Sequence, residues 1–148
     1  MGKKRIITGG GSGGENAEKE VGGSSASKKG VKKQVVKGTV NISSSYNNTI
    51  VSVADSKGNV FAHSSAGSLG FKGARKSTPY AATLVGKDAV EKAKKFGFQE
   101  ARISVKGIGP GREAAIRGIA STGVNITAII DATPMAHNGV RPAKPRRV

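Results

Sequence analysis

Cysteine is absent from this chain of 148 residues. Its absence excludes disulfides, zinc knuckles and cysteine nucleophiles, and it fits a protein of the reducing cytoplasm. Long apolar runs are absent too, since none approaches the roughly 18 residues that span a bilayer. The basic residues 3–5 are followed only by the short run 6–8 before the glycines begin, so the chain lacks a signal-peptide pattern. We therefore expect a cytoplasmic protein with no membrane segment.

Acidic residues are few, with 9 Asp and Glu against 25 Lys and Arg, and the net charge is +16. Self-repulsion at such a charge works against a compact state, so we expect a polyanionic partner to compensate it. Nucleic acid is the first candidate and an anionic membrane is the second.

Groups that could carry catalysis are also scarce. His63 falls in an expected strand, where a packed or surface role outweighs that of a general base, and His137 lies in a basic tail. A metal-dependent nuclease needs clustered carboxylates, but Asp55 and Asp131 are the only acids at strand ends, and each suits a turn or cap. The glycines of residues 107–111 differ in spacing from a dinucleotide-binding loop. We expect no enzyme, no metal site and no cofactor.

The few aromatic residues are spread along the chain, at Tyr46, Phe61, Phe71, Tyr80, Phe96 and Phe98. A platform that stacks RNA bases needs aromatic side chains together on one exposed strand face, and this pattern is missing. We expect the chain to hold RNA through its backbone and shape. Base stacking is then confined to Tyr46 and Phe71.

Composition divides the chain into three parts. Residues 1–34 form a basic, Gly/Ser-rich extension with almost nothing to bury, so disorder is expected. This extension is either a solvated tail or a basic arm that orders on RNA. Residues 35–133 form one α/β RNA-binding domain. Residues 134–148 form an extended basic tail, because prolines prevent regular structure there.

Hydrophobic periodicity predicts the elements of the domain. We expect strands near residues 35–42, 50–54, 60–63, 102–106 and 124–130, and helices at 79–96 and 112–122. The first three strands should form an antiparallel meander, and the strand–helix–strand crossovers should give a mixed sheet. The predicted fold is therefore α/β, a mixed five-stranded sheet with two helices in the order strand-strand-strand-helix-strand-helix-strand.

The helix ends have recognisable signals. Thr78 and Pro79 suit an N-cap and a first helical position, and Gly97 suits the end of the first helix. In the second helix we expect four residues to face inward, which are Ala115, Ile116, Ile119 and Ala120.

Three segments carry residue types that bind phosphate. In the first, the loop at residues 64–78, glycines let the backbone approach a ligand and Lys72, Arg75 and Lys76 supply charge. Free amides at the start of the following helix add donors and a positive dipole end. The alternative is an ordinary flexible loop.

The second segment, residues 106–112, again places a helix N-terminus beside cations, here Lys106 and Arg112. An anion site and a mere tight turn both remain open for it. If the third and fourth strands leave the sheet at the same end, both helix N-termini face one surface.

The third segment is the tail, whose arginines can grip phosphates with two hydrogen bonds. Its alternative is a disordered cationic tail that folds only on RNA. Within it, the Asn138-Gly139 pair can cyclise to isoaspartate, since glycine offers no side-chain hindrance. A peptide mass spectrum with only asparagine at this position would exclude that modification.

Seven runs of sequence stand out in and around these segments: SYNNTIV at 45–51, SSAG at 64–67, FKG at 71–73, RKSTP at 75–79, GPGRE at 109–113, DATP at 131–134 and HNGVRP at 137–142. Together they resemble the universal ribosomal protein eleven family of the small subunit, in its bacterial form. The resemblance covers about residues 33–148. It departs at Val140, where many members carry cysteine, and in residues 1–30, whose extension is longer and richer in glycine than the family needs.

The resemblance implies a ribonuclease-H-like sheet without nuclease activity, on the platform of the small ribosomal subunit. It implies small-subunit ribosomal RNA as partner, ribosomal proteins seven and eighteen as neighbours, and a share in the cleft that holds messenger RNA upstream of the start codon. Residues and resemblance together predict RNA contacts at Asn47, Asn48, Ser65, Gly67, Phe71, Lys72, Gly73, Arg75, Lys76, Ser77, Thr78, Lys106, Gly111, Arg112, His137, Asn138, Arg141, Lys144, Arg146 and Arg147.

Two other classes compete with this interpretation. A free-standing nucleic-acid chaperone or DNA-compacting protein would be equally basic, but ordered phosphate loops favour a fixed RNA surface. A metal-dependent nuclease on the same fold would need the carboxylate cluster that the sequence lacks.

Overall fold

The computed structural model describes residues 34–141, 143 and 144. The predicted disorder of the N-terminal extension, and the predicted RNA contacts of Arg146 and Arg147, fall outside the described residues.

Five strands and two α-helices form the domain, and their order is the predicted one. They are β1 (Lys37–Ser44), β2 (Thr49–Asp55), β3 (Val60–Ser65), α1 (Pro79–Lys94), β4 (Glu100–Lys106), α2 (Arg112–Ala120) and β5 (Asn125–Asp131). A short 3-10 helix, η1 (Gly73–Ser77), lies in the loop before α1 and was not predicted. The sheet order is β3-β2-β1-β4-β5, with β1, β2 and β3 antiparallel and β4 parallel to both β1 and β5. The predicted mixed sheet is confirmed.

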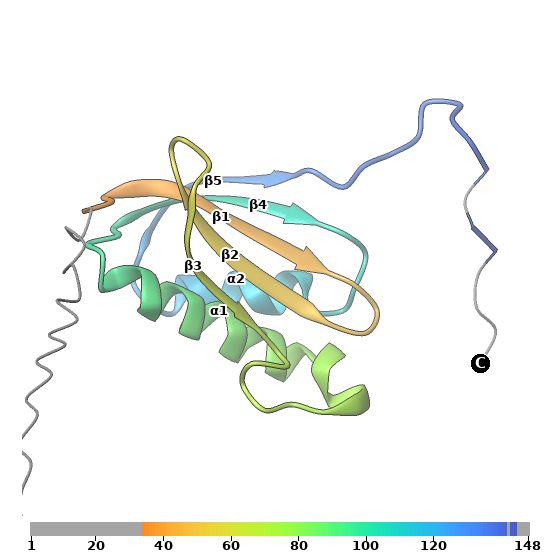
Figure 1. Cartoon of the computed structure of the whole chain (residues 1–148), viewed down its shortest axis with the longest axis horizontal. Coiled ribbons are helices and arrows are strands. Elements are labelled where there is room, and N and C mark those ends of the chain that lie inside the picture. The colour runs from red at the N-terminus through yellow and green to blue at the C-terminus, as the bar shows by residue number, and fades with distance from the viewer. Residues whose placement is uncertain (1–33, 142, 145–148) are drawn as a thin grey trace, which may run out of the picture. The chain divides into compact units, whose positions relative to one another are not determined.

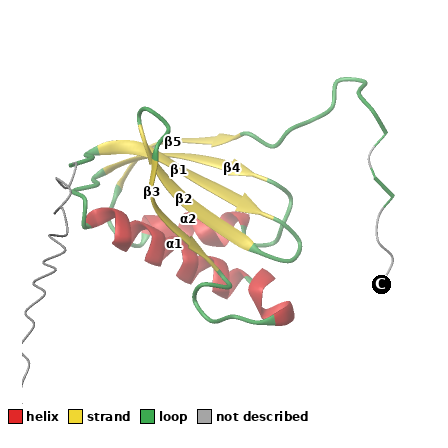
Figure 2. Ribbon diagram, in the orientation of Figure 1, coloured by secondary structure: helices red, strands yellow, loops and turns green. Residues whose placement is uncertain are grey.

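Both helices cover the same face of the sheet and pack against each other (Figure 2). The crossovers run from β3 to β4 and then to β5, so both move the same way across the sheet, and their common handedness puts both helices on one side. The helices approach closely at two glycines. A Cβ atom would lie 2.7 Å from the Ala115 carbonyl oxygen if added to Gly86, and 2.4 Å from that of Thr83 if added to Gly118.

The hydrophobic core lies between the sheet and these helices. Alternate side chains of the central strands point into it, because successive residues of a strand face opposite sides. Val40, Ile42, Val51, Val53 and Ile103 are almost completely buried. The small side chains on the buried face of α1 let the helix lie close to the sheet.

The start of α1 follows the predicted capping, and the Thr78 hydroxyl accepts a hydrogen bond from the Ala81 amide at 3.3 Å. Helix α2 ends at Ala120, two residues earlier than predicted. The prediction that Ala120 faces inward is wrong, because this residue is exposed and Gly118 is buried in the helix contact instead. A contact that admits only glycine leaves no apolar side chain for periodicity to detect.

The direction of the strands decides where the helices begin. Strands β3 and β4 both run parallel to β1, since β2 is antiparallel to both β1 and β3. The chain therefore leaves β3 and β4 at the same end of the sheet, called here the carboxyl edge. Helices α1 and α2 both start at this edge (Figure 1). The two helix N-termini thus share one side of the molecule, which the sequence had left open.

Candidate nucleic-acid interface

The carboxyl edge brings together two of the three predicted phosphate-binding segments and the turn that holds the predicted contacts Asn47 and Asn48. The parts that meet are the β1–β2 turn at residues 45–48, the loop at residues 66–78 and the loop at residues 107–111. Backbone hydrogen bonds join them: the Gly109 amide donates to the Ser44 carbonyl at 3.1 Å, and the Ala66 amide donates to the Thr49 carbonyl at 3.2 Å. Segments that are far apart in sequence therefore form one continuous surface.

Internal hydrogen bonds shape the loop at residues 66–78. The Phe71 amide donates to the Ala66 carbonyl at 3.1 Å, and η1 orders the residues before α1. The Ser68 hydroxyl donates to the Ser65 carbonyl at 2.8 Å. These hydrogen bonds give the loop a defined conformation, which argues against the alternative of an ordinary flexible loop.

The same loop carries basic side chains, and glycines with open space where a side chain would be. Lys72 and Arg75 are exposed and Lys76 is half-buried. The ion pairs among the described residues use other cations, so none of these three has a carboxylate partner there. A Cβ atom added at Gly70 would meet nothing within 4 Å, and one at Gly67 would meet only the Ser65 hydroxyl at 3.9 Å. The backbone is thus open to an approaching phosphate.

The loop at residues 107–111 needs its glycines for close packing, not for an open surface. Added Cβ atoms would lie 2.2 Å from the Ser45 carbonyl oxygen at Gly109 and 2.3 Å from the Thr49 hydroxyl at Gly111. Here glycine lets the loop pack onto the β1–β2 hairpin. Gly111 also leaves the start of α2 without a side-chain cap, so the first amides of α2 lack that partner. The tight-turn and anion-site interpretations of this loop are therefore compatible.

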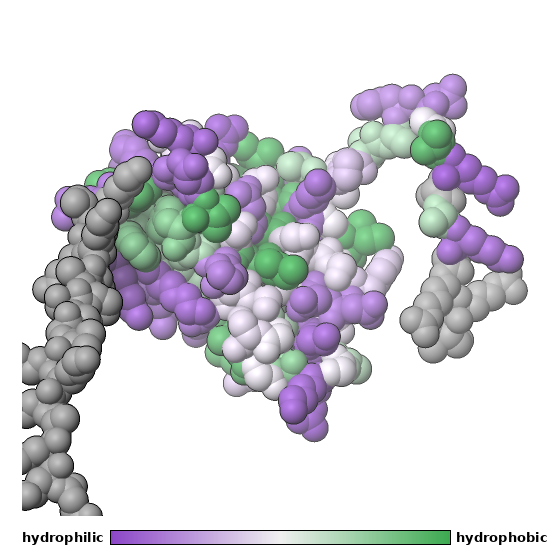
Figure 3. Space-filling model, viewed as in Figure 1, coloured by the Kyte–Doolittle hydropathy of each residue, from purple (hydrophilic) through white to green (hydrophobic). Residues whose placement is uncertain are grey.

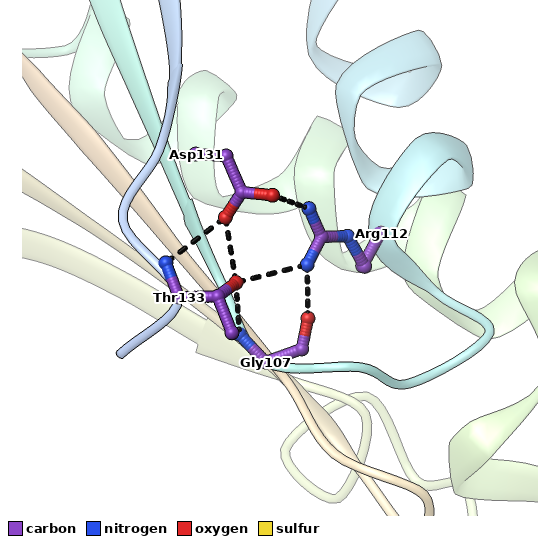
Figure 4. Close-up of polar contacts among 4 residues, drawn as sticks. All are labelled: Gly107, Arg112, Asp131 and Thr133. Carbon is purple, nitrogen blue, oxygen red and sulfur yellow. Dashed lines mark hydrogen bonds and ion pairs between the residues drawn. The ribbon is translucent and has the colours of Figure 1, made fainter. Parts of the chain in front are cut away.

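The Arg112 guanidinium is engaged inside the protein (Figure 4). It donates to the Gly107 carbonyl, to the Thr133 hydroxyl at 3.0 Å and to the Asp131 carboxylate at 2.5 Å. Asp131 also accepts from the Thr133 amide at 2.9 Å and from its hydroxyl at 2.6 Å. This cluster joins the start of α2, the loop after β4 and the residues that follow β5, where the tail begins. Arg112 therefore fixes where the tail leaves the sheet.

The hydrogen bonds from Thr133, followed by that from Arg112, lower the pKa of Asp131 to about 2. A carboxyl with a depressed pKa in the folded state stabilises the fold above its ordinary pKa of 3.8 and loses that contribution as the pH falls through about 2. At neutral pH the carboxylate stays charged and the Arg112 contact is intact.

The other predicted residues are spread over this edge and the tail. Asn47 and Lys106 are exposed and Asn48 is half-buried. His137, Asn138, Arg141 and Lys144 are exposed, and no described residue beyond Asp131 belongs to a helix or strand. Figure 3 shows hydrophilic side chains along this segment. Asn138 has a positive φ of 55°, and its isoaspartate stays a prediction.

Sequence reasoning missed several residues at this edge. Asp131 and Thr133 were not predicted to hold Arg112, because a contact between residues far apart in sequence leaves no local signal. Tyr80 was not counted as a base-stacking residue, although 68% of it is exposed and its ring lies 6.4 Å from that of Phe71. Its position two residues after the N-cap Thr78 was the available signal.

The described residues contain no group of three or more His, Asp or Glu side chains that could hold a metal ion. No helix within residues 34–141 is long and apolar enough to cross a membrane.

Basic loops, glycines with open space beside them and two helix N-termini at one edge of an α/β domain are features typical of proteins that bind polyanions. The family model described as Ribosomal protein S11 matches residues 38–147. The chain is also 54% identical over 121 residues to the small ribosomal subunit protein uS11 of Aquifex aeolicus (strain VF5), covering 82% of this chain and 97% of that protein. The chain therefore belongs to the ribosomal protein S11 family, whose role is structural rather than catalytic.

Proposed function

We propose that this chain is a structural protein of the small ribosomal subunit that binds ribosomal RNA at its carboxyl edge. The observation that carries the proposal is the convergence, at this edge, of both helix N-termini and of cations that have no carboxylate partner within the described part of the chain. Family membership supports the ribosome as the setting.

The binding is expected to rest on phosphates. Lys72, Arg75 and Lys76 neutralise backbone charge, the first amides of α2 add donors, and the dipoles of both helices are favourable. Arg112 acts mainly as a positioning residue, because its guanidinium is held by Gly107, Asp131 and Thr133. The tail cations extend the contact beyond the folded domain.

The resemblance supports a finer placement. In this proposal the protein lies on the platform of the small subunit, in the cytoplasm, beside ribosomal proteins seven and eighteen. It helps to form the cleft for messenger RNA upstream of the start codon. The division into an extension at 1–34, a domain at 35–133 and a tail at 134–148 assigns RNA contacts to the last two parts.

The test compares cations at the two ends of the sheet. Arg75→Ala should weaken binding to bacterial small-subunit ribosomal RNA severalfold and lower the slope of log affinity against log salt by about one. Lys57→Ala removes an exposed cation from the β2–β3 turn, at the opposite end, and should change neither quantity. Arg112→Ala should weaken RNA binding. It should also loosen the start of the tail at Thr133, which faster hydrogen exchange of the Thr133 amide would show. Equal losses for Arg75→Ala and Lys57→Ala would contradict a localised interface.

A further inference from the structure

Two aromatic rings lie together where the loop at residues 66–78 meets α1. The ring centroids of Phe71 and Tyr80 are 6.4 Å apart and their planes cross at 84°. Phe71 is half-buried against the core, which fixes its ring, whereas 68% of Tyr80 is exposed.

A hollow of about 370 Å³ opens at Phe71, the ring that Tyr80 neighbours, and its lining residues are Leu69, Gly70, Phe71, Lys72 and Arg75. Gly70 has a φ of +88° and open space where a side chain would be, so its part of the hollow is bare backbone. The hollow therefore combines an aromatic surface and an apolar side chain with two cations that have no carboxylate partner among the described residues.

This combination matches a nucleotide. A nucleobase stacks on an aromatic ring whatever its sequence, because every base has a π face. Since the two rings are perpendicular, one base can stack on one ring and contact the edge of the other. A phosphate alone would not use the rings, and an apolar peptide would not use the two cations.

We propose that this hollow binds one unpaired base of RNA against Phe71 and Tyr80, with the adjoining phosphate held by Lys72 and Arg75. The inference rests on the proposed function, in which the same loop binds RNA. It adds base contact at one nucleotide to a surface that otherwise binds backbone.

Tyrosine fluorescence gives a direct test. The chain has two tyrosines and no tryptophan, so Tyr46→Phe leaves Tyr80 as the only tyrosine. The probes are a short single-stranded oligoadenylate and an abasic ribose-phosphate oligomer of equal length. We expect both to bind and only the oligoadenylate to quench Tyr80. Binding of both with no quenching would overturn the base site and leave RNA binding intact, whereas binding of neither would overturn the proposed function too.

Substitutions measure the contribution of the rings. In the otherwise unchanged chain, Phe71→Leu and Tyr80→Leu should each lower affinity for the oligoadenylate, relative to the abasic oligomer, by about fivefold or more, since stacking contributes at least this much per base. Phe96→Leu is the matched control, because Phe96 is also a half-buried ring in an aromatic pair but lies beyond the end of α1, away from the carboxyl edge. The exposed Tyr80 keeps the test valid if Phe71→Leu perturbs folding. Unchanged relative affinity in both Phe71→Leu and Tyr80→Leu, or an equal decrease in Phe96→Leu, would overturn the proposal.

Discussion

Raising the salt concentration from about 50 to about 200 mM should weaken binding of this chain to small-subunit ribosomal RNA by about a thousandfold. Each phosphate that a cation neutralises releases counterions, and salt opposes that release. Neutralisation of about six phosphates gives a decrease of this size. The described cations available for them, none with a carboxylate partner among the described residues, are Lys72, Arg75, Lys76, Lys106, Arg141 and Lys144.

The matched control is the chain shortened after Ala136, which keeps the folded domain and removes the tail cations. Its salt slope should fall by about 0.7 to 0.9 for each phosphate that the tail neutralises in the full chain. A decrease in affinity smaller than about tenfold in the full chain would contradict binding to several phosphates.

Gly109→Ala should lower the free energy of unfolding by about 3 kcal/mol, at the upper end of the usual cost of an overpacked site. The added Cβ atom would lie 2.2 Å from the Ser45 carbonyl oxygen and 2.5 Å from the Ser44 hydroxyl. The first of these is backbone of the β1–β2 hairpin, so relief requires the loop to move away from it. The midpoint of urea unfolding measures the change.

Gly67→Ala is the corresponding control in the other loop. Its Cβ atom would meet only the Ser65 hydroxyl at 3.9 Å, so stability should change by less than about 0.5 kcal/mol. RNA affinity should fall instead, because the added methyl group lies on the surface offered to phosphate. Equal destabilisation by both substitutions would show that the two groups of glycines do not differ in role.

Local signals were sufficient for most of the fold. The Thr78-Pro79 pair marked the start of α1, and Gly97, with a φ of +83°, lies in the turn just after the helix, which ends at Lys94, two residues before the predicted end. Asp55 was expected to serve a turn, and its carboxylate accepts from the amides of Lys57 and Asn59. In each case the signal and the structure involve residues within a few positions of each other.

The site was less predictable because its decisive contacts are long-range. Arg112 looked like a free cation beside a helix N-terminus, yet its partner Asp131 lies on β5. The glycines of both loops looked alike, and only the approach of the β1–β2 hairpin separates them. The pairing of Phe71 with Tyr80 depends on how the loop folds back through η1. The sequence predicted which segments carry charge but did not assign the roles within them.

The central claim is that this chain is a fixed RNA-binding component of the small ribosomal subunit. The most direct measurement is sedimentation of a cell extract through a sucrose gradient in magnesium, with detection of this protein across the fractions. We predict that it travels with the small subunit and stays there through a moderate salt wash. Recovery at the top of the gradient, or together with DNA, would contradict the claim and favour a free-standing nucleic-acid chaperone or DNA-compacting protein.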